Sequence, residues 1–136
     1  MIELAQYWMG RDRAYPTDLT DEIRANAAET VKRANRLIAI YQKATGDVRP
    51  RGVNSGWRPA AVNAATPGAA KKSNHMLGRA LDISDASKTM KAWLMTPAGQ
   101  QALVECELWM EHPDATPAWV HVQIVPPASN RRVFVP

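Results

Sequence analysis

The chain has almost no cysteine and no long apolar run. Its one cysteine, Cys106, cannot form a disulfide within the chain, and a single thiol cannot build a cysteine-rich zinc site. Cys106 lies in an apolar pattern typical of a helix, which favours a buried, inert thiol over a reactive one. The N-terminus carries the acidic Glu3 where a secretion signal has basic residues, and no segment is apolar for long enough to span a membrane. We therefore expect synthesis in the cytoplasm without a signal peptide, and no membrane insertion.

Basic clusters interleaved with aromatic residues are also missing. The 17 Lys and Arg residues outnumber the 13 Asp and Glu residues and give a net charge of +4, which suggests a polyanionic partner or surface. Nucleic acid, a membrane surface and an anionic cell wall all fit this charge. Because the basic residues are scattered and no basic helix face alternates with aromatic residues, we favour the cell wall over nucleic acid.

The length and the apolar pattern predict one α+β domain over residues 1–136. With 136 residues and 46% apolar ones, the chain can bury a core without disulfides. Apolar residues recur every three or four positions over residues 20–44, which predicts a long helix, and most of residues 84–110 is also expected to be helical. Strands are expected near residues 53–59, 78–83, 109–111 and 119–125, with an edge strand in residues 131–136.

Two histidines and an aspartate are the candidate metal ligands. His75 and Asp82 lie seven positions apart on either side of Gly78, which would let the backbone turn or pass close to another element, and His121 lies in an apolar strand pattern. A lone histidine on an apolar strand is more often a hydrogen-bonded core residue than a ligand. Asp82 changes this balance, because a carboxylate at a core-facing position costs several kcal/mol unless a cation pairs with it. Two imidazoles, one carboxylate and one water are the composition of a catalytic zinc site.

The pattern Ser73-x-His75-x-x-Gly78-x-Ala80-x-Asp82, followed by the Trp-Val-His sequence that ends at His121, resembles the zinc peptidases of the M15 family. This family includes D-Ala-D-Ala peptidases and phage L-alanoyl-D-glutamate or DD-endopeptidases, and it shares a fold with the hedgehog signalling domain. The resemblance covers roughly residues 7–135 and is strongest to short phage-encoded members that consist of the catalytic domain alone. It implies a small antiparallel sheet with flanking helices, and a zinc ion bound in a cleft by His75, Asp82 and His121.

Three further segments bear on the site. The sequence Ser55-Gly56-Trp57-Arg58 resembles the family's Ser-Gly-Tyr/Trp-Arg segment, and the planar fork of Arg58 would hold a substrate carboxylate or the developing oxyanion rather than lie in solvent. Ser73 would either fix the geometry of a ligand through its hydroxyl or be a simple turn residue. Residues 7–12 also resemble the start of phage members, and they favour an aromatic anchor with a surface Arg–Asp pair over a role at the substrate rim.

The general base is the point at which the chain departs from the family pattern. Many members place a Glu or Asp three residues before the last histidine, or a second histidine two residues before it, whereas this chain has Ala118 and Trp119 there. The base is then expected on the neighbouring loop or strand, with Glu111 first, Asp114 second and His112 third. An exposed loop histidine is the favoured interpretation of His112.

The sequence therefore favours a monomeric zinc peptidase that cuts the peptide part of bacterial peptidoglycan. We expect a phage endolysin, released from the cytoplasm to act on the cell wall from the host periplasm. The alternative is a catalytically silent zinc-binding module for the cell wall or for another protein, which the missing base favours, and DNA binding ranks third. The D-Ala-D-Ala, L-Ala-D-Glu and D-Ala-diaminopimelate bonds all stay open as the bond that is cut.

Overall fold

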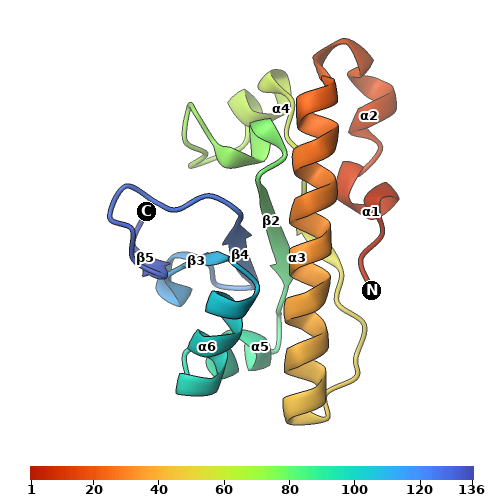
Figure 1. Cartoon of the computed structure of the whole chain (residues 1–136). Coiled ribbons are helices and arrows are strands. Elements are labelled where there is room, and N and C mark those ends of the chain that lie inside the picture. The colour runs from red at the N-terminus through yellow and green to blue at the C-terminus, as the bar shows by residue number, and fades with distance from the viewer.

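The computed structural model describes residues 1–136, which form α-helices, short 3-10 helices and strands (Figure 1). The α-helices are α1 (Leu4–Trp8), α2 (Arg11–Ala14), α3 (Asp21–Thr45), α4 (Ala60–Ala65), α5 (Thr89–Leu94) and α6 (Pro97–Glu105). The strands are β1 (Val53–Ser55), β2 (Ala80–Ser84), β3 (Trp109–Glu111), β4 (Trp119–Gln123) and β5 (Val133–Phe134). Three short 3-10 helices are η1 (Pro16–Asp18), η2 (Asn74–Leu77) and η3 (Pro113–Ala115). None of the helices has the length and apolar composition needed to cross a membrane.

The five strands form one sheet in the order β1-β2-β4-β3-β5. The central strands β2 and β4 are antiparallel and place Asp82 directly opposite His121. β1 and β3 pair antiparallel with β2 and β4, respectively. β5 is the edge strand that the sequence predicts, but it pairs with β3 in parallel, so the expectation of a wholly antiparallel sheet was wrong. The connection over residues 124–132 reverses the chain and passes β3, and β5 therefore runs antiparallel to β4 and parallel to β3.

The long helix α3 covers one face of the sheet (Figure 1). It begins where the hydroxyl of Thr20 accepts the amide of Ile23 at 3.1 Å, and it ends at Gly46, whose φ of 74° is left-handed. The helix predicted over residues 20–44 is thus confirmed to within one residue. Its buried face consists of Ile23, Ala27, Thr30, Val31, Ala34, Leu37, Ile38 and Tyr41.

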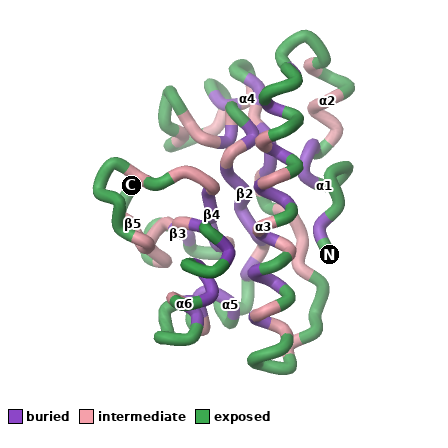
Figure 2. Tube along the Cα trace, in the orientation of Figure 1, coloured by how far each residue is buried: buried purple, intermediate pink, exposed green.

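The two central strands have different neighbours on their two faces. Leu81 and Ile83 of β2, with Val120 and Val122 of β4, pack into the hydrophobic core that also contains the buried face of α3. Because side chains alternate along a strand, the intervening residues Asp82, His121 and Gln123 lie on the opposite face. Figure 2 shows both strands as buried along most of their length. The polar side chains on this second face are therefore largely shielded from water.

Gly78 brings η2 against α3. Its φ of 72° is left-handed, and a Cβ atom at this position would lie 2.7 Å from the carbonyl oxygen of Ile23. The hydroxyl of Thr30 donates to the carbonyl of Gly78 at 2.7 Å. The sequence suggests that a glycine here allows a turn or a close approach of the backbone to another element, and both apply. The turn and the contact with α3 together place His75 beside the start of β2.

Candidate active site

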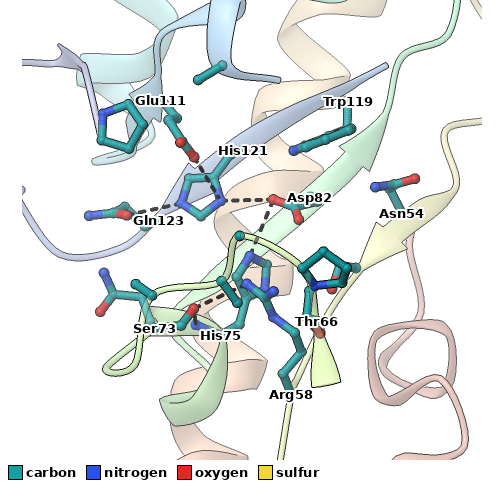
Figure 3. A pocket seen from close by; sticks show the side chains of 18 of the residues that line it. Asn54, Arg58, Thr66, Ser73, His75, Asp82, Glu111, Trp119, His121 and Gln123 are labelled. Atoms are coloured by element: carbon teal, nitrogen blue, oxygen red, sulfur yellow. Dashed lines mark hydrogen bonds and ion pairs between the residues drawn. The ribbon is translucent and has the colours of Figure 1, made fainter. Parts of the chain in front are cut away.

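His75, Asp82 and His121 come together from three neighbouring elements (Figure 3). Asp82 and His121 face each other across β2 and β4, and His75 enters from η2, which immediately precedes β2. Each residue offers one ligand atom such that all three atoms lie within 4.8 Å of one another, and the three residues are 1% to 8% exposed. The group can therefore hold one metal ion.

The hydrogen bonds of His75 leave one ring nitrogen without a partner. Nδ1 lies 2.8 Å from the carbonyl oxygen of Gly56, and because a carbonyl only accepts, Nδ1 carries the proton. Nε2 is then the nitrogen with the free lone pair. It points at Asp82 Oδ1 across 3.3 Å, yet it is buried and forms no hydrogen bond. A buried imidazole nitrogen without a partner, directed at a carboxylate and a second imidazole, is what a metal ligand requires.

Gln123 determines the orientation of His121. The amide nitrogen of Gln123 donates to the carbonyl of Val125 at 2.9 Å, so its amide oxygen is the atom that lies 3.1 Å from His121 Nε2. Nε2 donates to that oxygen, and Nδ1 lies 2.8 Å from Asp82 Oδ1. His121 Nδ1 is therefore the atom available to a metal. Gln123 lies two residues after His121 on the same strand face, and no motif in the sequence indicates this contact.

The charge of Asp82 is stabilised by the two histidines. Burial raises the pKa of Asp82, but the close contacts with His121 and His75 outweigh burial and leave that pKa below its usual range. Burial also lowers the pKa of His75, and the contact with Asp82 only partly offsets this. For His121 burial again lowers the pKa, but the nearby carboxylate of Asp82 more than compensates, so its pKa is raised. The cluster thus keeps one anionic oxygen between two imidazole rings.

Gly56 positions the carbonyl group to which His75 donates. A Cβ atom on Gly56 would lie 1.9 Å from the carbonyl oxygen of Tyr7, so only glycine fits against α1. The next amide, that of Trp57, donates to the same oxygen of Tyr7 at 3.2 Å. Tyr7 and Trp8 are buried and act as the aromatic anchor that the sequence predicts. The role of Gly56 was missed, because the contact joins segments that are distant in sequence.

Arg58 and Ser73 lie together at one end of the group (Figure 3). Arg58 Nη2 donates to the hydroxyl of Ser73 at 3.2 Å, and the same hydroxyl accepts the amide of His75 at 3.2 Å. Ser73 therefore caps η2 and connects Arg58 to the segment that carries His75. Arg58 Nε is buried without a partner, and Arg58 is half-buried in the cleft rather than extended into solvent.

The three candidate bases are in different surroundings. The side chain of Glu111 is 19% exposed, lines the cleft, and places Oε2 3.8 Å from His121 Nδ1 (Figure 3). Burial raises the pKa of the Glu111 carboxyl, although the nearby His121 lowers it. Asp114 and His112 line a separate, smaller pocket, where Asp114 is 95% exposed and the ring of His112 accepts the amide of Asp114. Of the three, only Glu111 lies in the cleft with the histidines.

The cleft around these residues has a volume of about 670 Å³ and is open to solvent. Residues 66–70, Lys72, Phe134 and Pro136 also line it. Arg11 from the N-terminal segment also lines the cleft. It forms no ion pair with Asp12, so the expected surface pair was wrong: Arg11 Nη1 donates instead to the carbonyl of Trp57 at 2.7 Å.

Comparison with known proteins gives one match. No curated protein and no solved structure matches the chain. A family model described as Peptidase M15 matches residues 17–122, which is most of the chain and includes all three residues of the buried His-Asp-His group. The family that the pattern from Ser73 to Asp82 predicts is thereby confirmed, and the chain belongs to the M15 family of peptidases.

Proposed function

We propose that this protein is a zinc-dependent peptidase that hydrolyses a peptide bond in the stem peptide or cross-link of bacterial peptidoglycan. The observation that carries the proposal is the unpartnered Nε2 of His75, which points at Asp82 beside His121 inside an open cleft. Membership of the M15 family supports peptidase chemistry. The single domain over residues 1–136 would carry the whole site.

The donor set fits a zinc ion. His75 Nε2, His121 Nδ1 and an oxygen of Asp82 are two nitrogens and one carboxylate, the set typical of zinc sites that keep a position open for chemistry. Gly56 and Gln123 hold the other ring nitrogens of the two histidines, as partners of metal-bound histidines usually do. Zinc bound here would supply a Lewis acid that activates water and polarises a peptide carbonyl.

Glu111 is the group that we assign to proton transfer. Its carboxylate faces His121 from β3 and lines the same cleft, so it can accept a proton from the attacking water and deliver that proton to the leaving amine. This contact replaces the carboxylate that many family members carry three residues before the last histidine.

Arg58 is the group that we assign to an anionic part of the substrate. Its guanidinium is fixed by Ser73 at the edge of the His-Asp-His group, and it still has free donors for a carboxylate or for the oxygen of the developing oxyanion. The fixed orientation matters, because a donor that is already in place needs no rearrangement during the reaction.

Mass spectrometry of muropeptides after digestion tests the activity and identifies the bond. The zinc-loaded protein should release new amino groups from purified sacculi, a chelator should abolish the release, and added zinc should restore it. Replacement of His121 by alanine should remove most of the bound zinc, and full zinc content in that variant would refute the assignment of ligands. Intact sacculi after incubation with the zinc-loaded protein would refute the proposed reaction.

The role as a phage endolysin, a monomer made in the cytoplasm that acts from the periplasm, rests on the resemblance to short phage members. Directing the protein to the periplasm of a host bacterium should lyse the culture, and unchanged turbidity would contradict this role. A silent cell-wall module would instead bind sacculi tightly and release no amino groups. The placement of Glu111 in the cleft favours the enzyme over the silent module. No base lies just before His121 in the sequence, but the carboxylate of Glu111 lies close to His121 in the folded chain.

A further inference from the structure

Arg11 and Arg58 are two arginines of the cleft that have no carboxylate partner. The exposed Arg13, Arg24, Arg36 and Arg131 also have no carboxylate partner, as is common in solvent. Among the other arginines that are partly buried, Arg33, Arg51 and Arg79 each form an ion pair with an Asp or Glu, and Arg132 lies over the ring of Trp109. Arg11 and Arg58 lie within 4.0 Å of no carboxylate, although both are partly buried and both line the cleft. Two guanidinium groups that the fold leaves unpaired in one cavity favour an anionic ligand.

Arg11 reaches the cleft one peptide unit away from Arg58. Its Nη1 donates at 2.7 Å to the carbonyl of Trp57, the residue before Arg58. Burial lowers the pKa of Arg58, the charge of Asp82 raises it, and the charge of Arg11 lowers it again, so the two guanidinium groups affect each other. A guanidinium has five N–H donors, and the bond to Trp57 uses one donor of Arg11. The others are available to a ligand.

The cleft carries charges of both signs. Arg11, Arg58 and Lys72 supply positive charge, whereas Asp82 and Glu111 supply the negative charge. A peptide in the cleft would therefore lie with its anionic groups toward the arginines and its scissile bond toward the His-Asp-His group. One carboxylate occupies one guanidinium when the two groups meet fork to fork, so two guanidinium groups can take two carboxylates.

We propose that Arg11 is a specificity-determining residue that binds a second carboxylate of the substrate, in addition to the anionic group held by Arg58. The substrate class is then a peptide with two carboxylates near the bond that is cut, such as a stem peptide whose D-glutamate and diaminopimelate carboxylates are free. This inference rests on the proposed function, because it names the peptides that the same site accepts.

A purely structural role for Arg11 makes a different prediction. In that case Arg11 would only hold α2 against the segment that contains Trp57, through its hydrogen bond to the Trp57 carbonyl. The hydrogen bond from the amide of Trp57 to Tyr7 and the buried ring of Trp8 already hold that segment in place. Loss of a purely structural contact would lower the rate on all peptides alike. Loss of a carboxylate contact would slow only the peptides that carry that carboxylate.

The test uses synthetic stem peptides in pairs, in which one member has a free carboxylate and the other has a carboxamide at the same position. Wild-type kcat/KM should favour the acid at one position by about tenfold to a hundredfold, the scale of a hydrogen bond to a charged group. Arg11→Gln should abolish that preference, mainly through KM, and slow the acid far more than the amide. Arg13→Gln is the matched control, because Arg13 lies on the same helix α2, is exposed, and is not part of the cleft.

Two kinetic results would overturn the proposal. In one, Arg11→Gln slows the acid and the amide peptides equally, and in the other the acid preference is unchanged. Isothermal titration calorimetry of the same peptides separates these results from a failure of the proposed function. If the wild-type protein cuts no peptide, the reaction is refuted, but tighter binding of the acid that disappears in Arg11→Gln would still support the carboxylate contact. Equal binding of acid and amide by the wild-type protein would refute it.

Discussion

Replacement of Gly56 by alanine should weaken the fold and the metal site together. The added Cβ would lie 1.9 Å from the Tyr7 carbonyl oxygen, whereas ordinary contacts begin near 3.4 Å, so the two segments would have to separate by roughly 1.5 Å. That shift would break the bond from the amide of Trp57 to Tyr7 and move the carbonyl of Gly56 away from His75 Nδ1. Two lost hydrogen bonds at about 1 kcal/mol each, with packing strain of about 1 to 3 kcal/mol, give a loss of about 3 to 5 kcal/mol.

Thermal unfolding and zinc titration measure the two effects of Gly56→Ala. For a domain of this size, the loss corresponds to a decrease in Tm of about 10 °C or more. Zinc affinity should fall by about tenfold to a hundredfold, because His75 loses the acceptor that fixes its ring. Gly52→Ala is the matched control in the preceding loop, since its Cβ would meet only the hydroxyl of Ser84 at an ordinary 3.6 Å. A Gly56→Ala variant with the Tm and zinc affinity of the wild-type protein would refute the reasoning.

Four further substitutions test the site. Glu111→Gln should keep zinc and Tm while lowering turnover by about a hundredfold or more, and Asp114→Asn should change little; the reverse pattern would move the base to the loop. Arg58→Lys should keep zinc and fold but lose activity, because a point charge does not replace the planar fork, and wild-type turnover would return Arg58 to a surface role. Gln123→Leu should lower zinc affinity by about tenfold to a hundredfold by freeing the ring of His121, and unchanged affinity would show that Gln123 does not orient it.

The sequence predicted the features that depend on local pattern. The periodicity of residues 20–44 located α3 to within one residue, and the helical stretch expected in residues 84–110 is present as α5 and α6. The spacing of His75 and Asp82 around Gly78 worked in the same way, because a glycine in the left-handed region turns η2 directly into β2. These features need only the residues next to them in the chain.

The features that the sequence did not reveal depend on contacts between distant segments. The group that accepts the hydrogen bond from His75 Nδ1 is the backbone carbonyl of Gly56. Because no side chain is involved, the residue type at this position does not indicate the contact. The entry of Arg11 into the cleft depends on how α2 packs near the carbonyl of Trp57, and the pattern of residues 7–12 favoured a surface pair instead. The parallel pairing of β5 depends on the path of residues 124–132, which carry no periodic signal. A single sequence gives the order of such segments but not their neighbours.

The position of the proposed base follows from the register of the sheet. Met110 of β3 lies opposite Val122 of β4, so Glu111 comes one residue further along β3, beside His121. His121 is in turn opposite Asp82 of β2. Three adjacent strands thus present Asp82, His121 and Glu111 as one cross-strand row on the face away from α3. A carboxylate on β3 can therefore take the place of the one that, in the family resemblance, many members carry three residues before the last histidine. The side chains stay together only while β3 and β4 keep this register, because a slip of one residue would turn Glu111 to the opposite face.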